Sequence, residues 1–406
     1  MDNIKVIVSN PTRMHTHQLC TVLEKSNRLR MFITSFWYKP NSFVHRFFCS
    51  LPIIGEIIKN TLKKRFYSGF SADRVITNPI SEIFFTIKKY IPVSHKNDAL
   101  KQHYIHDKFT ARHLNNIEYD VFIGYEESCL RSFKTAKRQN KITILDLTQV
   151  HWKYLENVRE KHPVYRTFQE DELFYKRSAI KNEELKYADY IFALSSLMKN
   201  SLIDNGIDKN KIFLINLGFD PSLFHIKNAY NLNEERPLKL LFVGGIGLAK
   251  GIELLLRMSK ETDNVQLTFV GTIAENARNI LNEYKEYYTH IPFLHHEELV
   301  KVYQEHDLFV FPSYQDSWAM VVLEAMACGT PVIITENTGS KDVVVQGGGK
   351  IIPVDDLDAL KSAIDYYNVN RERLKEDGKK ANEVVQNYTW DNYYAQINEV
   401  ISLITK

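Results

Sequence analysis

The sequence is poor in cysteine and has no long apolar run. Its four cysteines lie far apart, which excludes a disulfide framework and a zinc knuckle built from neighbouring residues. No stretch of about 18 apolar residues is present, and Asp2 stands where a signal peptide needs basic residues. We therefore expect a cytoplasmic protein with no membrane-spanning segment.

Internal repeats and low-complexity tracts are also missing, and the composition excludes a disordered or fibrous chain. Hydrophobic residues make up 44% of the sequence and charged residues 25%, as in soluble globular proteins. At about 150 residues per domain, a chain of 406 residues predicts two or three domains.

The net charge of +3 is too small to indicate nucleic-acid binding, but its distribution is uneven. Residues 1–100 carry fifteen basic and six acidic residues. Within them, residues 51–70 predict a helix with isoleucines on one side and basic residues on the other, which favours peripheral contact with an anionic membrane. The alternative is an ordinary domain helix with a solvated basic face. The basic residues are Lys59, Lys63, Lys64 and Arg65.

Short strand-like runs alternate with helical patterns along the whole chain, which predicts the α/β class with doubly wound parallel sheets. The first series of strands is expected at residues 5–9, 29–34, 120–124, 142–146, 189–194 and 211–215. The second is expected at residues 238–243, 265–270, 307–311, 331–335 and 350–352. Residues 219–237 show neither the helical nor the strand pattern of apolar residues, which indicates a connector. Ligands of such sheets bind beyond the carboxyl ends of the strands, so two facing sheets suit transfer between two substrates.

The densest chemical signal is the run from residue 309 to residue 335. We expect Ser317 to cap a helix over residues 317–327, which would leave the N–H groups of Ala319 and Met320 as an anion site. Asp316 and Glu324 are eight residues apart, so both carboxylates would face one side of that helix and contact one extended ligand. The alternative is a capping aspartate and a surface glutamate.

A glycine-rich turn follows the strand at residues 238–243. Gly244 and Gly245 would let the backbone approach a phosphate, and Lys250 would supply a compact positive charge.

These two stretches resemble the nucleotide-sugar site of the family 4 glycosyltransferases, which are retaining enzymes of the GT-B fold. The family has Glu-x7-Glu followed by Ala-Met-Ala-x-Gly-x-Pro-Val, and here Asp316 stands first and Glu324 second. The resemblance implies that Glu324 binds the donor ribose and that Asp316, one methylene shorter than the family's Glu, contacts the sugar. It also implies that Lys250 binds the diphosphate, while Gly245 stands where the family has an Arg.

The resemblance extends to the domain organisation. It implies two Rossmann-like domains facing a central cleft, and a last helix that crosses back to the first domain. The expected parts are an acceptor-binding domain at residues 1–218, the connector at 219–237, a nucleotide-sugar domain at 238–388 and the crossing helix at 389–406.

Candidate residues in the first half rest on their own chemistry. His151 follows a strand end where the family often has a cleft histidine, and we expect it to act beside Asp316. Arg13 and His15 follow the first strand and are candidates for the acceptor side, although the preferred interpretation of positions 15 and 17 is a pair of solvated histidines. Glu126 and Glu127 also follow a strand end and would face the cleft.

The sequence thus predicts a hexosyltransferase-type glycosyltransferase that retains anomeric configuration and acts in bacterial surface polysaccharide or lipopolysaccharide synthesis. Its partners would be a nucleotide-diphosphate sugar and a glycan or glycolipid acceptor, without a metal or other cofactor. The alternatives are a nucleotide-sugar epimerase or hydrolase, and a catalytically silent nucleotide-sugar-binding subunit. The expected donor-binding residues are Gly244, Gly245, Lys250, Ser317, Trp318, Ala319, Met320 and Glu324.

Overall fold

The computed structural model describes all residues except 1–3, 13–14, 36, 38–68, 79–97 and 169. Residues 51–68 of the expected helix at 51–70, and Arg13, therefore lie outside the described residues. None of the helices within the described ranges combines the length and apolar character that crossing a membrane requires.

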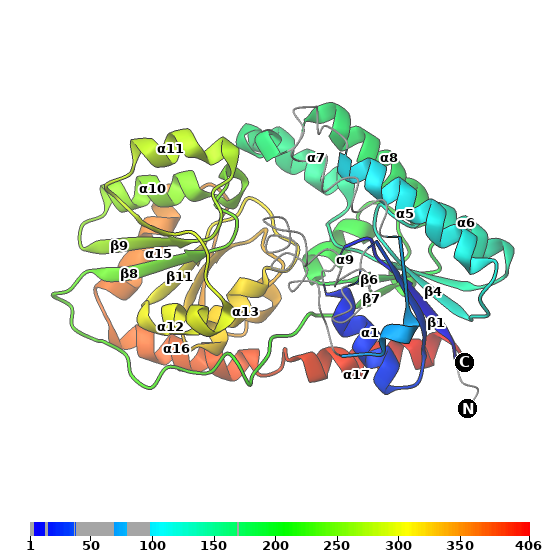
Figure 1. Ribbon diagram of the computed structural model, residues 1–406. Coiled ribbons are helices and arrows are strands. Elements are labelled where there is room, and N and C mark those ends of the chain that lie inside the picture. The colour runs from blue at the N-terminus through cyan, green and yellow to red at the C-terminus, as the bar shows by residue number, and fades with distance from the viewer. Residues whose placement is uncertain (1–3, 13–14, 36, 38–68, 79–97, 169) are drawn as a thin grey trace, which may run out of the picture.

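The described residues form two parallel sheets, each covered by helices (Figure 1). The first sheet has the order β3-β2-β1-β4-β5-β6-β7. Its strands are β1 (Val6–Ser9), β2 (Leu29–Thr34), β3 (Val75–Thr77), β4 (Val121–Tyr125), β5 (Ile142–Asp146), β6 (Tyr190–Ala193) and β7 (Ile212–Leu214). The second sheet has the order β10-β9-β8-β11-β12-β13. Its strands are β8 (Leu238–Val243), β9 (Val265–Val270), β10 (Thr289–Ile291), β11 (Leu308–Phe311), β12 (Val332–Thr335) and β13 (Gly349–Ile352).

The predicted α/β class with two doubly wound units is confirmed. Every expected strand is present, and the central strands are buried on both faces, as their apolar runs require. Two strands of three residues each, β3 and β10, were not expected and lie at sheet edges. The chain between β7 and β8 contains no helix or strand, as expected for a connector.

The helices of the first unit lie in two layers (Figure 1). One face of the sheet carries α5, α6 and α8 side by side, and the other carries α1 packed against α17. The helices are α1 (Thr16–Lys25), α5 (Asp98–Leu114), α6 (Leu130–Arg138), α7 (Trp152–Lys161), α8 (Asp171–Tyr187) and α9 (Ser196–Ile203).

The second unit is built in the same way. Its helices are α10 (Ile252–Glu261), α11 (Arg278–Glu283), α12 (His296–Glu305), α13 (Met320–Ala327), α14 (Lys341–Val344), α15 (Leu357–Asn368) and α16 (Glu372–Val385). The following helix, α17 (Trp390–Ile404), packs on the first unit. Short 3-10 turns are η1 (Ala72–Arg74), η2 (Pro163–Phe168), η3 (Lys209–Lys211), η4 (Leu248–Lys250) and η5 (Glu275–Ala277).

The chain passes between the two units twice, and the two passages lie side by side. Phe219 N donates to Tyr388 O at 3.0 Å, and Trp390 N donates to Phe219 O at 3.3 Å. A Cβ on Gly218 would lie 2.1 Å from the backbone of Thr389, so this approach requires glycine.

After the second passage, α17 packs on the first unit, along the lower edge of Figure 1. Arg28 Nη2 donates to Ser402 Oγ at 2.7 Å, and Tyr394 donates to Gln18 Oε1. The last helix in the sequence therefore stabilises the unit formed by the first residues.

Candidate functional site

The loop that joins β11 to α13 carries most of the predicted site, and Asp316 organises it. One carboxylate oxygen of Asp316 accepts from Trp318 N at 3.0 Å, and the other lies 2.6 Å from Lys250 Nζ. The ion pair connects this loop to η4, so two stretches 66 residues apart meet at one point.

Ser317 does not cap α13, contrary to the sequence prediction. The helix begins at Met320, and Ala319 before it has a left-handed φ of +56°, which no interior helical residue adopts. Ser317 Oγ instead donates to Gln149 Oε1, 2.6 Å away in the first unit. Asp316 therefore lies outside the helix, and the argument that it shares a helical face with Glu324 does not hold.

Trp318 is buried beside the start of α13. Its ring centroid lies 6.0 Å from that of Tyr388, and its indole Nε1 has no hydrogen-bond partner among the described residues. Met320 follows as the first residue of the helix.

Gly251 is what allows Lys250 to reach Asp316. Gly251 has a left-handed φ of +72°, and a Cβ there would lie 2.0 Å from Pro312 O. The turn can thus pack directly against the end of β11, and Lys250 Nζ lies 5.4 Å from the centre of the Phe311 ring. Gly244 has a φ of +143°, whereas a Cβ on Gly245 would meet open space within 4 Å.

Glu324 lies on α13 with its carboxyl group facing α12. Tyr303 donates its hydroxyl to Glu324 Oε2 at 3.0 Å. Burial raises the pKa of Glu324 to about 7, because an ionised carboxylate loses solvation there, and the bond from Tyr303 only partly opposes this. The carboxyl group therefore titrates near neutrality.

His151 is the residue before α7 and caps that helix. Its Nδ1 accepts from Lys153 N at 3.3 Å, and its backbone N donates to Ser201 Oγ at 2.9 Å. Burial, together with the charges of Lys153 and Lys181, lowers the pKa of His151 to about 4. The ring is thus neutral at pH 7, and an accepting Nδ1 leaves the proton on Nε2.

The two histidines after the first strand are buried, so the preferred interpretation of solvated histidines is wrong. His15 Nε2 lies 3.0 Å from both carboxylate oxygens of Asp146, at the end of β5. His17 packs among aromatic rings, with its centroid 5.3 Å from that of Trp37. Both histidines lie on or next to α1, whose inner face covers the sheet.

Glu126 and Glu127 are paired with basic side chains of α8. Lys181 Nζ lies 3.2 Å from a carboxylate oxygen of each, and Arg177 Nη2 lies 2.6 Å from Glu127. Although burial opposes it, Lys181, His103 and Arg177 hold the pKa of Glu127 well below its usual range. A carboxylate paired in this way is a poor proton acceptor.

Further contacts join the loops of the two units, and no pattern in the sequence predicts them. Tyr154 donates to Asn337 Oδ1 at 2.7 Å, and Tyr165 donates to Gln315 Oε1 at 3.3 Å. Ser196 N donates to Asp342 at 2.6 Å. The structure thus brings Lys250 and Asp316 into direct contact and places Ser317 against the first unit. No cluster of side chains suited to a metal ion occurs within the described ranges.

The comparison with known proteins gives a family match that covers most of the second unit. Residues 225–384 match the family model described as glycosyl transferases group 1. An uncharacterized glycosyltransferase of Methanocaldococcus jannaschii is 27% identical over 57% of this chain and 65% of its own length. The capsular polysaccharide biosynthesis glycosyltransferase CapM of Staphylococcus aureus is 29% identical over 51% of this chain and 61% of its own. The matched region therefore spans less than two thirds of either relative.

Solved structures resemble the whole chain. Sucrose-phosphate synthase from Thermosynechococcus elongatus has a TM-score of 0.70 at 20% identity, with 99% of both chains covered. Anabaena HepE in complex with UDP-glucose has a TM-score of 0.65 at 12% identity, covering 98% of this chain and 99% of its own. WaaG, a glycosyltransferase involved in lipopolysaccharide biosynthesis, has a TM-score of 0.64 at 13% identity, covering 98% and 99%. These likenesses confirm the predicted GT-B fold.

Proposed function

Because residues 225–384 belong to the group 1 glycosyl transferases and the chain has the GT-B fold, we propose that the protein transfers a sugar from a nucleotide-diphosphate sugar to an acceptor. The observation that carries this proposal is the 2.6 Å contact between Lys250 and Asp316. Both residues lie beyond the carboxyl ends of β8 and β11, where open parallel sheets bind ligands, which supports Lys250 as the cation for a diphosphate and Asp316 as the carboxylate for sugar hydroxyls.

The leaving diphosphate gains negative charge as the sugar departs. In the proposed mechanism, Lys250 and the first N–H groups of α13 stabilise this charge, so the step needs no metal ion. Gly244 and Gly245 let the backbone approach the phosphates, and Glu324 accepts from the ribose hydroxyls. Glu324 does so best in its ionised form, because a charged acceptor makes the stronger hydrogen bond.

Asp316 and His151 position the sugar in this proposal. Asp316 accepts from sugar hydroxyls after exchanging part of its contact with Lys250, and neutral His151 donates from Nε2 on the opposite wall. Neither attacks the sugar. The acceptor enters on the face from which the diphosphate leaves, so the anomeric configuration is retained.

The acceptor would bind to the first unit, whose sequence shows the faintest resemblance to the family. The names of CapM and WaaG support a bacterial surface polysaccharide or lipopolysaccharide as the acceptor. We further propose that the transferred sugar is a hexose and that the protein acts at the inner face of the plasma membrane. The buried His15 and the paired Glu126 and Glu127 would then shape the acceptor wall, and Glu127, with its lowered pKa, would not act as a base.

A donor screen tests the proposal. Nucleotide sugars that raise the melting temperature are incubated with the protein, with and without glycan acceptors, and free nucleotide diphosphate is measured. We expect acceptor-dependent release that persists in chelator and gives a product of unchanged anomeric configuration. Acceptor-independent hydrolysis, binding without turnover, an inverted product or loss of activity in chelator would each contradict it.

A further inference from the structure

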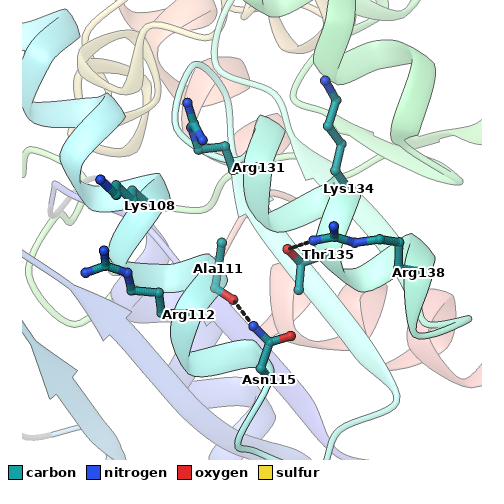
Figure 2. Close-up of a pocket in the computed structure, with 8 residues that line it drawn as sticks. All are labelled: Lys108, Ala111, Arg112, Asn115, Arg131, Lys134, Thr135 and Arg138. Atoms are coloured by element: carbon teal, nitrogen blue, oxygen red, sulfur yellow. Dashed lines mark hydrogen bonds between the residues drawn. The ribbon is translucent and has the colours of Figure 1, made fainter.

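The clearest pocket outside the proposed active site lies between α5 and α6 (Figure 2). It has a volume of about 350 Å³. Lys108 and Arg112 line it from α5, and Arg131, Lys134 and Arg138 line it from α6, together with Ala111, Asn115 and Thr135. In Figure 1 these two helices flank the first unit on the side away from the second sheet, so the pocket is separate from the Lys250–Asp316 site.

The pocket is strongly cationic. Its five basic residues carry more positive charge than the net +3 of the whole chain, and none of its lining residues is acidic. None of the five forms an ion pair within the part of the chain that the structure describes. Lys108 and Arg112, and likewise Lys134 and Arg138, are four residues apart on their helices, a spacing at which like charges repel. An anion bound between the helices would relieve this repulsion.

The nearest carboxylate is already engaged and braces one end of the pocket. Asp107 on α5 accepts from Arg131 N at 2.7 Å and from Ser132 N at 2.9 Å, which ties α5 to the first turn of α6. Ser132 Oγ also donates to Asp107 at 2.6 Å. Asp107 therefore fixes the distance between the helices, and both of its carboxylate oxygens are occupied by these hydrogen bonds.

The other end is braced as well. Gln139 Nε2 donates to Leu114 O at 3.3 Å and to Asn115 Oδ1 at 3.2 Å, and Tyr119 donates to Gln139 Oε1 at 2.6 Å. Since both ends are tied, the space between the helices is present before any ligand arrives.

Two of the guanidinium groups are also held in place. Arg138 Nη2 donates to Thr135 Oγ1 at 3.0 Å, a contact drawn in Figure 2. Arg131 Nη2 donates to Tyr104 at 2.8 Å, and its guanidinium lies 4.6 Å from the centre of that ring. Fixed guanidinium groups lose little freedom on binding, and their planar fork matches phosphate oxygens.

We propose that this pocket, lined by Lys108, Arg112, Arg131, Lys134 and Arg138, binds a phosphate group. Its chemistry suits a phosphate carried by a lipid headgroup and a free inorganic phosphate or diphosphate equally. A phosphate bound in this pocket would anchor the first unit to the molecule or membrane that carries it, and would leave the proposed donor site at Lys250 and Asp316 accessible.

Two probes distinguish these sources. Calorimetry with inorganic pyrophosphate measures the free anion, and co-sedimentation with phosphatidylglycerol vesicles, against phosphatidylcholine vesicles, measures the headgroup. The test variant is Lys108→Gln/Lys134→Gln, which removes one exposed charge from each helix. Its matched control is Lys375→Gln/Lys379→Gln, which removes two exposed lysine charges from α16. Circular dichroism checks that both variants are folded.

We expect at least one probe to bind the wild type and to bind the Lys108/Lys134 variant about tenfold more weakly or worse. The Lys375/Lys379 variant should bind normally. Binding should also survive in Lys250→Ala, which separates this pocket from the proposed donor site. Binding of vesicles alone would assign the headgroup, and binding of pyrophosphate alone the free anion. No binding of either probe, or equal losses in both lysine pairs, would overturn the proposal.

Discussion

Lys250 Nζ lies 2.6 Å from Asp316 Oδ2, although the two residues belong to different strand-to-helix connections. The pair joins the loop after β8 to the loop after β11. Each partner keeps the other in place before a ligand arrives. A substitution at either position therefore changes both the charge that faces the donor and the shape of the loop that holds it.

Asp316→Asn should lower turnover about a hundredfold while leaving nucleotide affinity within a few fold. The amide keeps the size of the side chain but loses the charge that orients the sugar, and a misplacement of about 1 Å has an effect of this order on rate. Steady-state kinetics and calorimetry with the nucleotide diphosphate measure the two effects. Asp263→Asn, an exposed carboxylate after α10, is the control. An equal fall in affinity and turnover would place Asp316 at the nucleotide.

Glu324→Ala should weaken nucleotide binding about ten- to a hundredfold, because it removes a charge-assisted hydrogen bond to ribose. The exposed Glu283, on α11, supplies the control Glu283→Ala. Calorimetry with the matching nucleotide diphosphate gives both affinities. Wild-type affinity in Glu324→Ala would remove this residue from the proposed site.

The pH dependence of nucleotide binding follows from the carboxyl group of Glu324. Its pKa of about 7 means that it becomes ionised as the pH rises from 6 to 8, so nucleotide affinity should increase by up to about tenfold over that range. Glu324→Gln should abolish this increase, and Glu283→Gln should retain it. Affinity that does not change with pH in the wild type would contradict the raised pKa.

Stability should change in the opposite direction. The pKa of Glu324 is higher in the folded state, about 7 against an ordinary 4.5, so the folded protein binds the extra proton between these values. The free energy of unfolding that this group contributes therefore falls as the pH rises through that window. Urea unfolding at several pH values should show a smaller fall in Glu324→Gln than in the wild type.

Gly245→Arg should strengthen diphosphate binding by about tenfold, since it adds the second cation that the related motif contains. A Cβ at this position would meet open space, so the backbone tolerates the change. Gly245→Gln is the uncharged control. Affinity and its dependence on salt are the measurements, and equal effects of Arg and Gln would show that charge is not responsible.

Gly251→Ala should destabilise the protein by about 2 to 3 kcal/mol, through left-handed strain and a clash with Pro312 O. Gly206→Ala isolates the first effect, because Gly206 has a φ of +87° but a Cβ there would meet nothing within 4 Å. Urea unfolding of both variants gives the comparison. Equal losses would mean that the contact with Pro312 contributes nothing.

The sheets could be predicted from sequence because buried parallel strands are apolar over their whole length, as in Leu238–Val243. The edge strands Val75–Thr77 and Thr289–Ile291 were missed because their three residues include polar ones and form no apolar run, whereas the equally short Ile212–Leu214 is entirely apolar and was predicted. The turn that contains Gly244, Gly245 and Lys250 could also be predicted, because turn formation depends on neighbouring residues in the sequence.

The predictions that failed concern positions whose structure depends on residues far away in the sequence. The sequence at Ser317 suits a helix cap, but Gln149 of the other unit takes its hydroxyl group and the left-handed Ala319 delays the helix. The contact of Tyr154 with Asn337 joins residues 183 positions apart, and no local pattern encodes it. The burial of His15 likewise depends on Asp146 from another strand.

The paired passages at Phe219 and Thr389 make the joint between the units a double one. One connecting segment alone would leave the units free to rotate about it, whereas two segments joined by hydrogen bonds restrict that rotation. The two units should therefore move relative to each other mainly by bending at this joint. A chimaera that joins the first unit to a different second unit would therefore need both connecting segments, at Phe219 and Thr389, together with α17.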